Sequence, residues 1–273
     1  MQVTSHDAAR FRALAEPFYR RDPVAHTVEL AGLAAPELPA DAVLLTVCDG
    51  GRVIGAAVRT PPYPLVCALP VDAAGAVAAV LADVAPGLPA VRGPRPGTEA
   101  LAQAWVRRTG ATVAGRTEER LHVLGDLAAP AGVAGRARAG DAGDGELLAD
   151  WSGRFFAETF GVPGVPAHGF VTAQRTAGSR FVLWLRDGMP VSLAMVRRPA
   201  AGVARIGPVY TPGAHRGHGY ASAVTAAAAQ QARAAGAADV VLFTDVANPV
   251  AGALYRRLGF VPRADWLAVD FAP

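Results

Sequence analysis

Short apolar runs joined by Asp-Gly turns recur in the two halves of this chain. Residues 44–57 read LLTVCDGGRVIGAA and residues 181–194 read FVLWLRDGMPVSLA, so each segment is an apolar run, a turn and a second apolar run. An Asp-Gly pair between β-type runs is typical of a tight hairpin, because Asp and Gly tolerate the positive φ that such turns need. The pattern therefore predicts one β-hairpin in each half.

A second parallel lies further along each half. The segment WVRRTGATV begins at Trp105, and LYRRLGFVP begins at Leu254. Each is the end of an amphipathic helix, a glycine suited to a left-handed C-cap, and the start of a strand. Two matches in the same order predict an internal duplication, with chance similarity between alanine-rich segments as the alternative. The Ala/Gly-rich stretch 128–144 predicts a linker that has room for a short strand, so we expect domains at 1–126 and 127–273.

The C-terminal half has the pattern of an α/β domain. It predicts a helix over 145–160, a Gly/Pro-rich loop over 161–169, the hairpin, and a strand over 204–210. A glycine turn, a helix over 220–235 capped by Gly236, a strand from Val240 and a helix near Asn248 follow, and the last strand contains Trp266–Phe271. Strand, glycine turn, helix and strand in this order place a ligand at the turn.

Composition narrows the class of protein. Of 273 residues, 52% are hydrophobic, which is enough for a sizeable core, but no apolar run approaches the roughly 18 residues of a membrane helix. The N-terminus has no apolar core of the signal-peptide kind, so we expect a cytoplasmic protein without a membrane partner. Cys48 and Cys67 fall in predicted strands without CxxC spacing, which argues against a disulfide framework and a metal site.

The net charge is +3, and arginine supplies all of the positive side-chain charge, since the chain has no lysine. The arginines are scattered, so a nucleic-acid partner is not expected, although a mild positive balance could help to attract an anionic cofactor.

The sequence GPVYTPGAHRGHGYASAV, residues 207–224, carries the candidate chemistry. A helix N-terminus leaves backbone N–H groups unpaired, and Gly217 and Gly219 let a ligand approach the backbone. Such a turn can hold a pyrophosphate, with Arg216 adding charge. It is neither a Walker loop nor GxGxxG, which disfavours an NAD or FAD enzyme.

The run RGHGYA, residues 216–221, resembles the Arg/Gln-x-x-Gly-x-Gly/Ala signature of the GNAT acetyltransferases. Downstream, NPVAGALYRRLGF, residues 248–260, resembles that family's second characteristic helix. The likeness covers about 133–273 and looks most like the tandem-GNAT group. It implies an α/β (α+β) fold of two tandem GNAT-like domains, each a mixed, mostly antiparallel sheet flanked by helices.

The resemblance implies acetyl-CoA as co-substrate and direct transfer of its acetyl group to an amine on a small molecule or peptide. Tyr255 is then the proton donor to the departing thiolate, and it shares a helix face with Asn248, two turns earlier. A core tyrosine is the structural alternative. Glu158 is the first candidate base, Asp245 the second, and His168 and His218 are further options. The implied cofactor-binding residues are Val209, Tyr210, Thr211, Arg216, Gly217, His218, Gly219, Tyr220, Ala221, Ser222 and Asn248.

The N-terminal half is expected to be a degenerate copy without a cofactor. Aligning WVRRTG on LYRRLG puts Val106 in the place of Tyr255 and Glu99 in the place of Asn248. Only Pro70 and Val71 separate the strand around 65–69 from the following helix, so no glycine pair is available there. This half then covers the acceptor cleft or makes a homodimer contact, and the sequence leaves both open. A non-catalytic acyl-CoA-binding module is the alternative to an enzyme.

Overall fold

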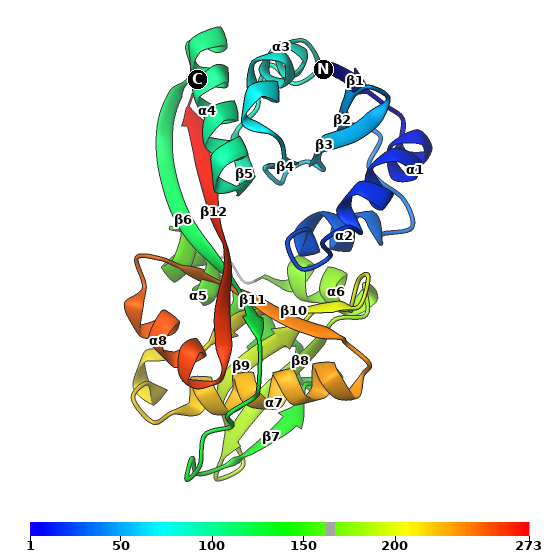
Figure 1. The fold of residues 1–273 in the computed structure, drawn as a ribbon. Helices are drawn as coiled ribbons and strands as arrows, with labels where there is room; N and C mark the ends of the chain where they lie inside the picture. Colours follow the sequence, from blue (N-terminus) through cyan, green and yellow to red (C-terminus); the bar gives the residue numbers. More distant parts are fainter. Residues whose placement is uncertain (162–166, 273) are drawn as a thin grey trace. The chain divides into compact units, whose positions relative to one another are not determined.

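The computed structural model describes residues 1–161 and 167–272, and the chain divides into two compact units (Figure 1). Unit 1 comprises Met1–Leu121, Thr244–Asn248 and the residues from Arg263 onward; unit 2 comprises His122–Phe243 and Pro249–Pro262. The chain thus first passes from unit 1 to unit 2 after Leu121 and later returns twice to unit 1. Most of the expected Gly/Pro-rich loop, residues 162–166, lies outside the described residues.

The N-terminal half of the chain supplies ten principal elements. They are β1 (Gln2–Ser5), α1 (Ala8–Tyr19), α2 (Thr27–Leu33), β2 (Val43–Asp49), β3 (Arg52–Arg59), β4 (Leu65–Ala68), α3 (Ala74–Val84), β5 (Ala90–Pro94), α4 (Arg95–Thr109) and β6 (Thr112–Leu124).

The C-terminal half supplies ten more in the same order of helices and strands. They are β7 (Arg136–Ala139), α5 (Gly145–Phe160), α6 (His168–Thr176), β8 (Arg180–Arg186), β9 (Met189–Val196), β10 (Val203–Tyr210), α7 (Tyr220–Ala234), β11 (Asp239–Asp245), α8 (Pro249–Arg257) and β12 (Phe260–Ala272). An identical order in both halves is what an internal duplication produces.

Each half forms a mixed, mostly antiparallel sheet flanked by helices, as predicted. Unit 1 has the strand order β1-β2-β3-β4-β5-β12-β6, with β4 and β5 parallel and β12 pairing antiparallel with β5 through Trp266–Asp270. In unit 2, β7, β8, β9 and β10 are antiparallel neighbours, and β10 is parallel to β11. The last strand of the chain therefore completes the sheet of the N-terminal unit.

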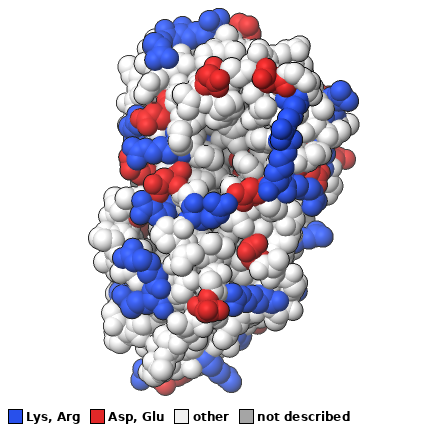
Figure 2. Space-filling model, in the orientation of Figure 1, with Lys and Arg blue, Asp and Glu red and all other residues white. Residues whose placement is uncertain are grey.

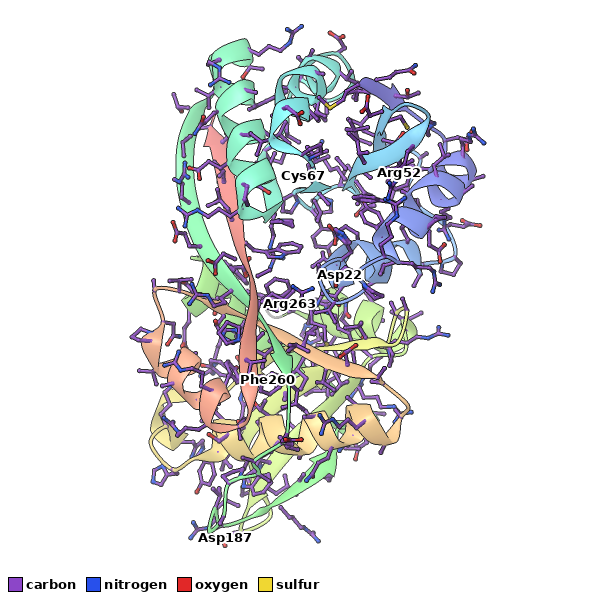
Figure 3. The ribbon with its side chains drawn as sticks, viewed as in Figure 1. Asp22, Arg52, Cys67, Asp187, Phe260 and Arg263 are labelled. Atoms are coloured by element: carbon purple, nitrogen blue, oxygen red, sulfur yellow. The ribbon has the colours of Figure 1, made fainter. Side chains whose placement is uncertain are left out.

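Local chemistry explains why the elements end where they do. Both Asp-Gly hairpins form: Gly50 and Gly51 have φ of 54° and 80°, and Asp187 and Gly188 have φ of 50° and 82°. Positive φ at both central residues matches the right-handed twist of the flanking strands. Asp187 accordingly lies at the tip of the β8–β9 hairpin (Figure 3). Gly110 and Gly161 end α4 and α5 in the left-handed conformation, so these boundaries were correctly predicted.

The core of unit 2 forms around α7, whose alanines pack against β9 and β10. Ala226, Ala228, Ala229 and Ala232 are buried in one cluster with Ile206, Leu242 and Phe260. Small side chains let the helix lie close to the sheet, which fixes the position of its N-terminus. None of the described helices is both long and apolar enough to cross a membrane.

In unit 1 the backbone is tightly packed where β4 leads into α3. A Cβ added to Gly93 would lie 2.0 Å from the Cys67 carbonyl oxygen, and one added to Gly97 would lie 2.1 Å from that of Leu69. Only Leu69, Pro70 and the short 3-10 turn Val71–Ala73 connect β4 to α3. The start of α4 is thus pressed against the end of β4, and no space remains there for a ligand.

We predict that Gly97→Ala destabilises the protein by about 2–3 kcal/mol, because backbone must move to admit the methyl group. Gly75→Ala is the matched control: Gly75 is exposed on α3, nothing lies within 4 Å of an added Cβ, and a gain of up to about 1 kcal/mol is expected. Urea unfolding measures both. A Gly97→Ala protein as stable as the wild type would show that the β4–α4 contact is loose.

Candidate functional site

The site in unit 2 begins where two parallel strands part. The β10–β11 ladder pairs Val203–Arg205 with residues 239–241 and, within the described structure, goes no further. On its other edge β10 shifts register against β9 between Ile206 and Val209, where Gly207 has φ of 146°. The outer part of β10 therefore remains paired with β9 but is not paired with β11. The backbone groups on the edge toward β11 can bind a ligand.

The glycine turn follows directly. Gly217 and Gly219 have φ of 82° and 79°, in the region that favours glycine, and α7 begins at Tyr220. The first bond into α7 runs from the Ala223 N–H to the Gly219 carbonyl at 3.0 Å. The N–H groups of the three preceding residues, 220–222, therefore have no acceptor within the helix. Nothing lies within 4 Å of a Cβ built on Gly217, whereas one built on Gly219 would lie 3.1 Å from Val133 Cγ2, so the turn is open to an anion at Gly217.

Arg216 ties the turn to the first helix of the unit. Its Nε donates to the Thr211 carbonyl at 2.9 Å, and its Nη2 donates to Glu158 Oε2 at 2.5 Å. The guanidinium carbon also lies 5.9 Å from the centre of the Tyr210 ring. The arginine of the predicted motif is therefore present at the turn, but it is paired with a carboxylate.

Glu158 accepts a second hydrogen bond, from the Tyr210 hydroxyl to its Oε1 at 2.8 Å. The Tyr210 ring is only 5% exposed and meets Trp151 of α5 edge-on, with ring centres 6.3 Å apart. The Arg216 hydrogen bond lowers the pKa of Glu158, and burial followed by the Glu158 hydrogen bond raises the pKa of Tyr210. The structure thus joins three predicted site residues, Glu158, Tyr210 and Arg216, in one network.

Tyr255 lies on α8, half-buried, with its ring edge-on to Phe260 at 6.0 Å. Tyr255 and Val209 pack against the same core cluster as Phe260. Burial raises the pKa of Tyr255 to about 12, so its hydroxyl stays protonated throughout the neutral range. It can give a hydrogen bond or a proton but is a poor proton acceptor.

The other candidates have visible structural roles. The Asp245 carboxylate accepts the Ala247 N–H at 2.7 Å, and the Asp245 carbonyl accepts the Asn248 N–H at 3.0 Å, one residue before α8 begins. His168 and Glu146 approach to 2.9 Å on the surface. His218 has its Nδ1 2.8 Å from the Arg216 carbonyl and stacks on Tyr220, whose hydroxyl lies 3.5 Å from Arg186. The Asp245 and His218 side chains therefore hydrogen-bond within their own turns.

Sequence reasoning missed Ser192, which is fully buried in β9. Its Oγ donates to the Tyr210 carbonyl at 3.2 Å and lies 2.8 Å from Thr211 Oγ1, so it fastens the end of β10. No sequence signal distinguishes it from other serines in a strand.

The charges do not indicate a metal or a polyanion site. In the described part of the chain no three His, Cys, Asp or Glu side chains are grouped as metal ligands would be, and Cys48 and Cys67 are free thiols. On the face in Figure 2, arginines and acidic residues are interspersed rather than segregated.

The comparisons with known proteins agree with this geometry. Residues 146–260 match the model of the acetyltransferase (GNAT) family. A GCN5-related N-acetyltransferase from Kribbella flavida is 22% identical over 93% of this chain and 95% of its own, with a TM-score of 0.63. One from Sphaerobacter thermophilus is 17% identical over 99% and 95%, with a TM-score of 0.64.

A tandem GNAT protein from the clavulanic acid biosynthesis pathway is 16% identical over 100% of this chain and 99% of its own, with a TM-score of 0.59. No curated protein matches the sequence. At these identities the solved structures establish the fold, and the predicted architecture of two tandem GNAT-like domains is confirmed.

We predict that Arg216→Gln raises the pKa of Glu158, because the Arg216 hydrogen bond is the largest cause of its depression. Carboxyl NMR titration of Glu158 measures the change. Arg154→Gln is the control: Arg154 pairs with Asp150 at 3.0 Å and affects Glu158 least, so that variant should move the titration little. Equal shifts in the two variants would mean that general surface charge, not the Arg216 contact, sets the pKa.

Proposed function

We propose, from the match of residues 146–260 to the GNAT acetyltransferase family model and from the site geometry, that unit 2 transfers an acetyl group from acetyl-CoA to an amine. The observation that carries the proposal is the glycine turn at the N-terminus of α7, placed beside the free edge of β10. The turn presents the N–H groups of residues 220–222, has open space at Gly217, and holds Arg216 at its mouth. These groups fit a pyrophosphate.

Within unit 2 the cofactor would be held by residues expected from the sequence, with the edge of Val209–Thr211 and the turn 216–222 making backbone contacts. When bound, acetyl-CoA supplies the acetyl thioester. The backbone N–H groups at the end of β10 would stabilise an oxyanion on the acetyl carbonyl. The Tyr255 hydroxyl, whose pKa burial raises to about 12, is protonated at neutral pH and would be the proton donor to the sulfur as the amine takes the acetyl group.

Glu158 is the proposed base that removes the proton from an ammonium acceptor. While paired with Arg216, its low pKa makes it a weak base. A phosphate that took over Arg216 would remove the main cause of that low pKa. Glu158 would then become a better proton acceptor when the donor substrate is in place.

The acceptor itself would approach the first helix of unit 2. Phe155, Phe156 and Phe160 cluster on α5 next to Glu158, and Phe170 of α6 packs on Phe156 at 5.0 Å. Phe160 is 55% exposed. We therefore test the function with a panel of amines that includes phenethylamine and ethanolamine, and follow release of free thiol from acetyl-CoA. Cofactor binding without turnover on any amine would favour a non-catalytic acyl-CoA-binding module.

Unit 1 is proposed to bind no cofactor. The close contacts of Gly93 and Gly97 fill the place that is open in unit 2, and Val106 has no proton to give. Glu99, at the position of Asn248, pairs with Arg116 at 2.7 Å. One acetyl-CoA per chain is the expected stoichiometry.

We predict that the wild type binds one equivalent of acetyl-CoA by calorimetry and that Gly219→Val abolishes this binding. A β-branched residue at φ of 79° is strained, and the side chain blocks the backbone of the turn. Gly213→Ala is the control, because nothing lies within 4 Å of its added Cβ, and it should bind normally. Two equivalents in the wild type would place a working site in unit 1, and one equivalent remaining in Gly219→Val would show that acetyl-CoA binding does not depend on this turn.

We predict that Tyr255→Phe lowers turnover about 100-fold or more while acetyl-CoA affinity changes little, because the hydroxyl acts when the thiolate leaves. Since the Tyr255 pKa is about 12, the wild-type rate should show no falling limb due to this group below pH 10 or so. A variant with wild-type turnover on its best amine would move the acid role to another group.

Glu158→Gln gives a contrasting result on the same assay. It removes both the base and the carboxylate that competes for Arg216, so turnover should fall while acetyl-CoA binds at least as tightly. Glu146→Gln, on the same helix, should leave both quantities unchanged.

A further inference from the structure

A pocket lies at the opposite end of α7 from the glycine turn. It has a volume of about 290 Å³ and opens between the end of α6, the start of β8, the β9–β10 turn and the last turn of α7. The helix spans 15 residues, so the pocket and the turn are about 20 Å apart along its axis. The pocket belongs entirely to unit 2 and is separate from the proposed cofactor site.

Three arginines line this pocket: Arg180, Arg197 and Arg198. No carboxylate is among its described lining residues, and neither Arg180 nor Arg198 forms an ion pair with a carboxylate elsewhere in the described chain. Arg197 donates to Gln174 Oε1 at 2.9 Å, which holds its guanidinium in place. The stem of Arg198 lies against Gly178, where an added Cβ would be 3.2 Å from its Cδ.

Capping of the two helix ends does not explain these arginines. The carbonyls of residues 173–175 at the end of α6 accept the N–H groups of residues 177–179. The Gln231, Ala232 and Arg233 carbonyls of α7 likewise accept backbone N–H groups. The two helix C-termini contribute about −0.5 charge each, against the full positive charges of Arg180 and Arg198, which have no carboxylate partner among the described residues. The pocket therefore keeps a net positive field.

Part of the pocket lining is apolar. Val196, Pro199, Ala232 and Ala235 contribute to it, and the two alanines leave room that larger residues on α7 would fill. A volume of this size is at the lower end of ordinary small-molecule sites. We propose that this pocket is a second ligand site of unit 2, selective for a small molecule that combines an anionic group with a compact apolar body.

The test uses the full chain and benzoate as the probe, with neutral benzamide as its isostere and phenyl phosphate to distinguish a carboxylate from a phosphate ligand. Calorimetry at constant chloride should show that benzoate or phenyl phosphate binds and that benzamide does not. Arg180→Gln and Arg198→Gln should each weaken binding about 10-fold or more, as expected for a lost charged hydrogen bond. Arg136→Gln removes an exposed arginine of the same unit outside the pocket and should change nothing.

Ala235→Phe provides a second variant, because Ala235 is exposed and its replacement fills the pocket without entering the core. It should abolish probe binding while acetyl-CoA binding persists. The proposal is overturned if neither anion binds at millimolar concentration, if benzamide binds as well as benzoate, or if Arg136→Gln weakens binding as much as the pocket variants. Competition between the probe and acetyl-CoA would place the anion at the glycine turn, and would also overturn it.

Discussion

The parting of β10 from β11 beyond Arg205 is the constraint on which the rest of the site depends. Two parallel strands that stay paired leave no backbone groups for a ligand, whereas strands that diverge expose one edge of each. The register shift against β9 and the buried Ser192 keep the outer part of β10 in place while it lacks its β11 neighbour. Pairing with β9 stabilises the outer part of β10 although its other edge is unpaired. A ligand can bind to the backbone groups of that free edge.

The two halves show how the same fold loses or keeps such a site through few residues. In unit 2 the connection from β10 to α7 is long enough for a glycine turn, and the space at Gly217 is open. In unit 1 the connection is reduced to Leu69, Pro70 and one short turn, and Gly93 and Gly97 let neighbouring backbones touch. Glycine therefore has opposite roles in the two units. In unit 2 it opens the backbone to a ligand, and in unit 1 it allows neighbouring backbone segments to touch. The apolar pattern is common to both because the core requires it in both.

Much of this could be predicted from the sequence, because the decisive signals are local. The helix over 145–160 and the start of the helix at Tyr220 were correctly predicted, since capping glycines and the glycine turn fix them within a few residues. The return of β12 to the sheet of unit 1 was not, because strand order depends on pairing between distant segments. The contact of Arg216 with Glu158 joins positions 58 residues apart, and only the tertiary fold brings them together. The sequence predicted both Glu158 and Arg216 as site residues but could not predict the contact between them.

That pair links the two substrates of the proposed reaction. Glu158 lies on the helix expected to face the acceptor, and Arg216 lies at the turn expected to hold the donor. The Glu158 carboxylate and the donor phosphate would therefore compete for the Arg216 guanidinium. Both side chains are about half exposed, and water screens their attraction enough for a multiply charged phosphate to compete. Competition from Glu158 for Arg216 lowers the affinity for the donor. By linkage, donor binding then changes the pKa of Glu158 by the same coupling free energy. In the proposed reaction, the contact with Arg216 would keep Glu158 a weak base until the donor binds, and the same contact holds Arg216 at the turn in the absence of the donor.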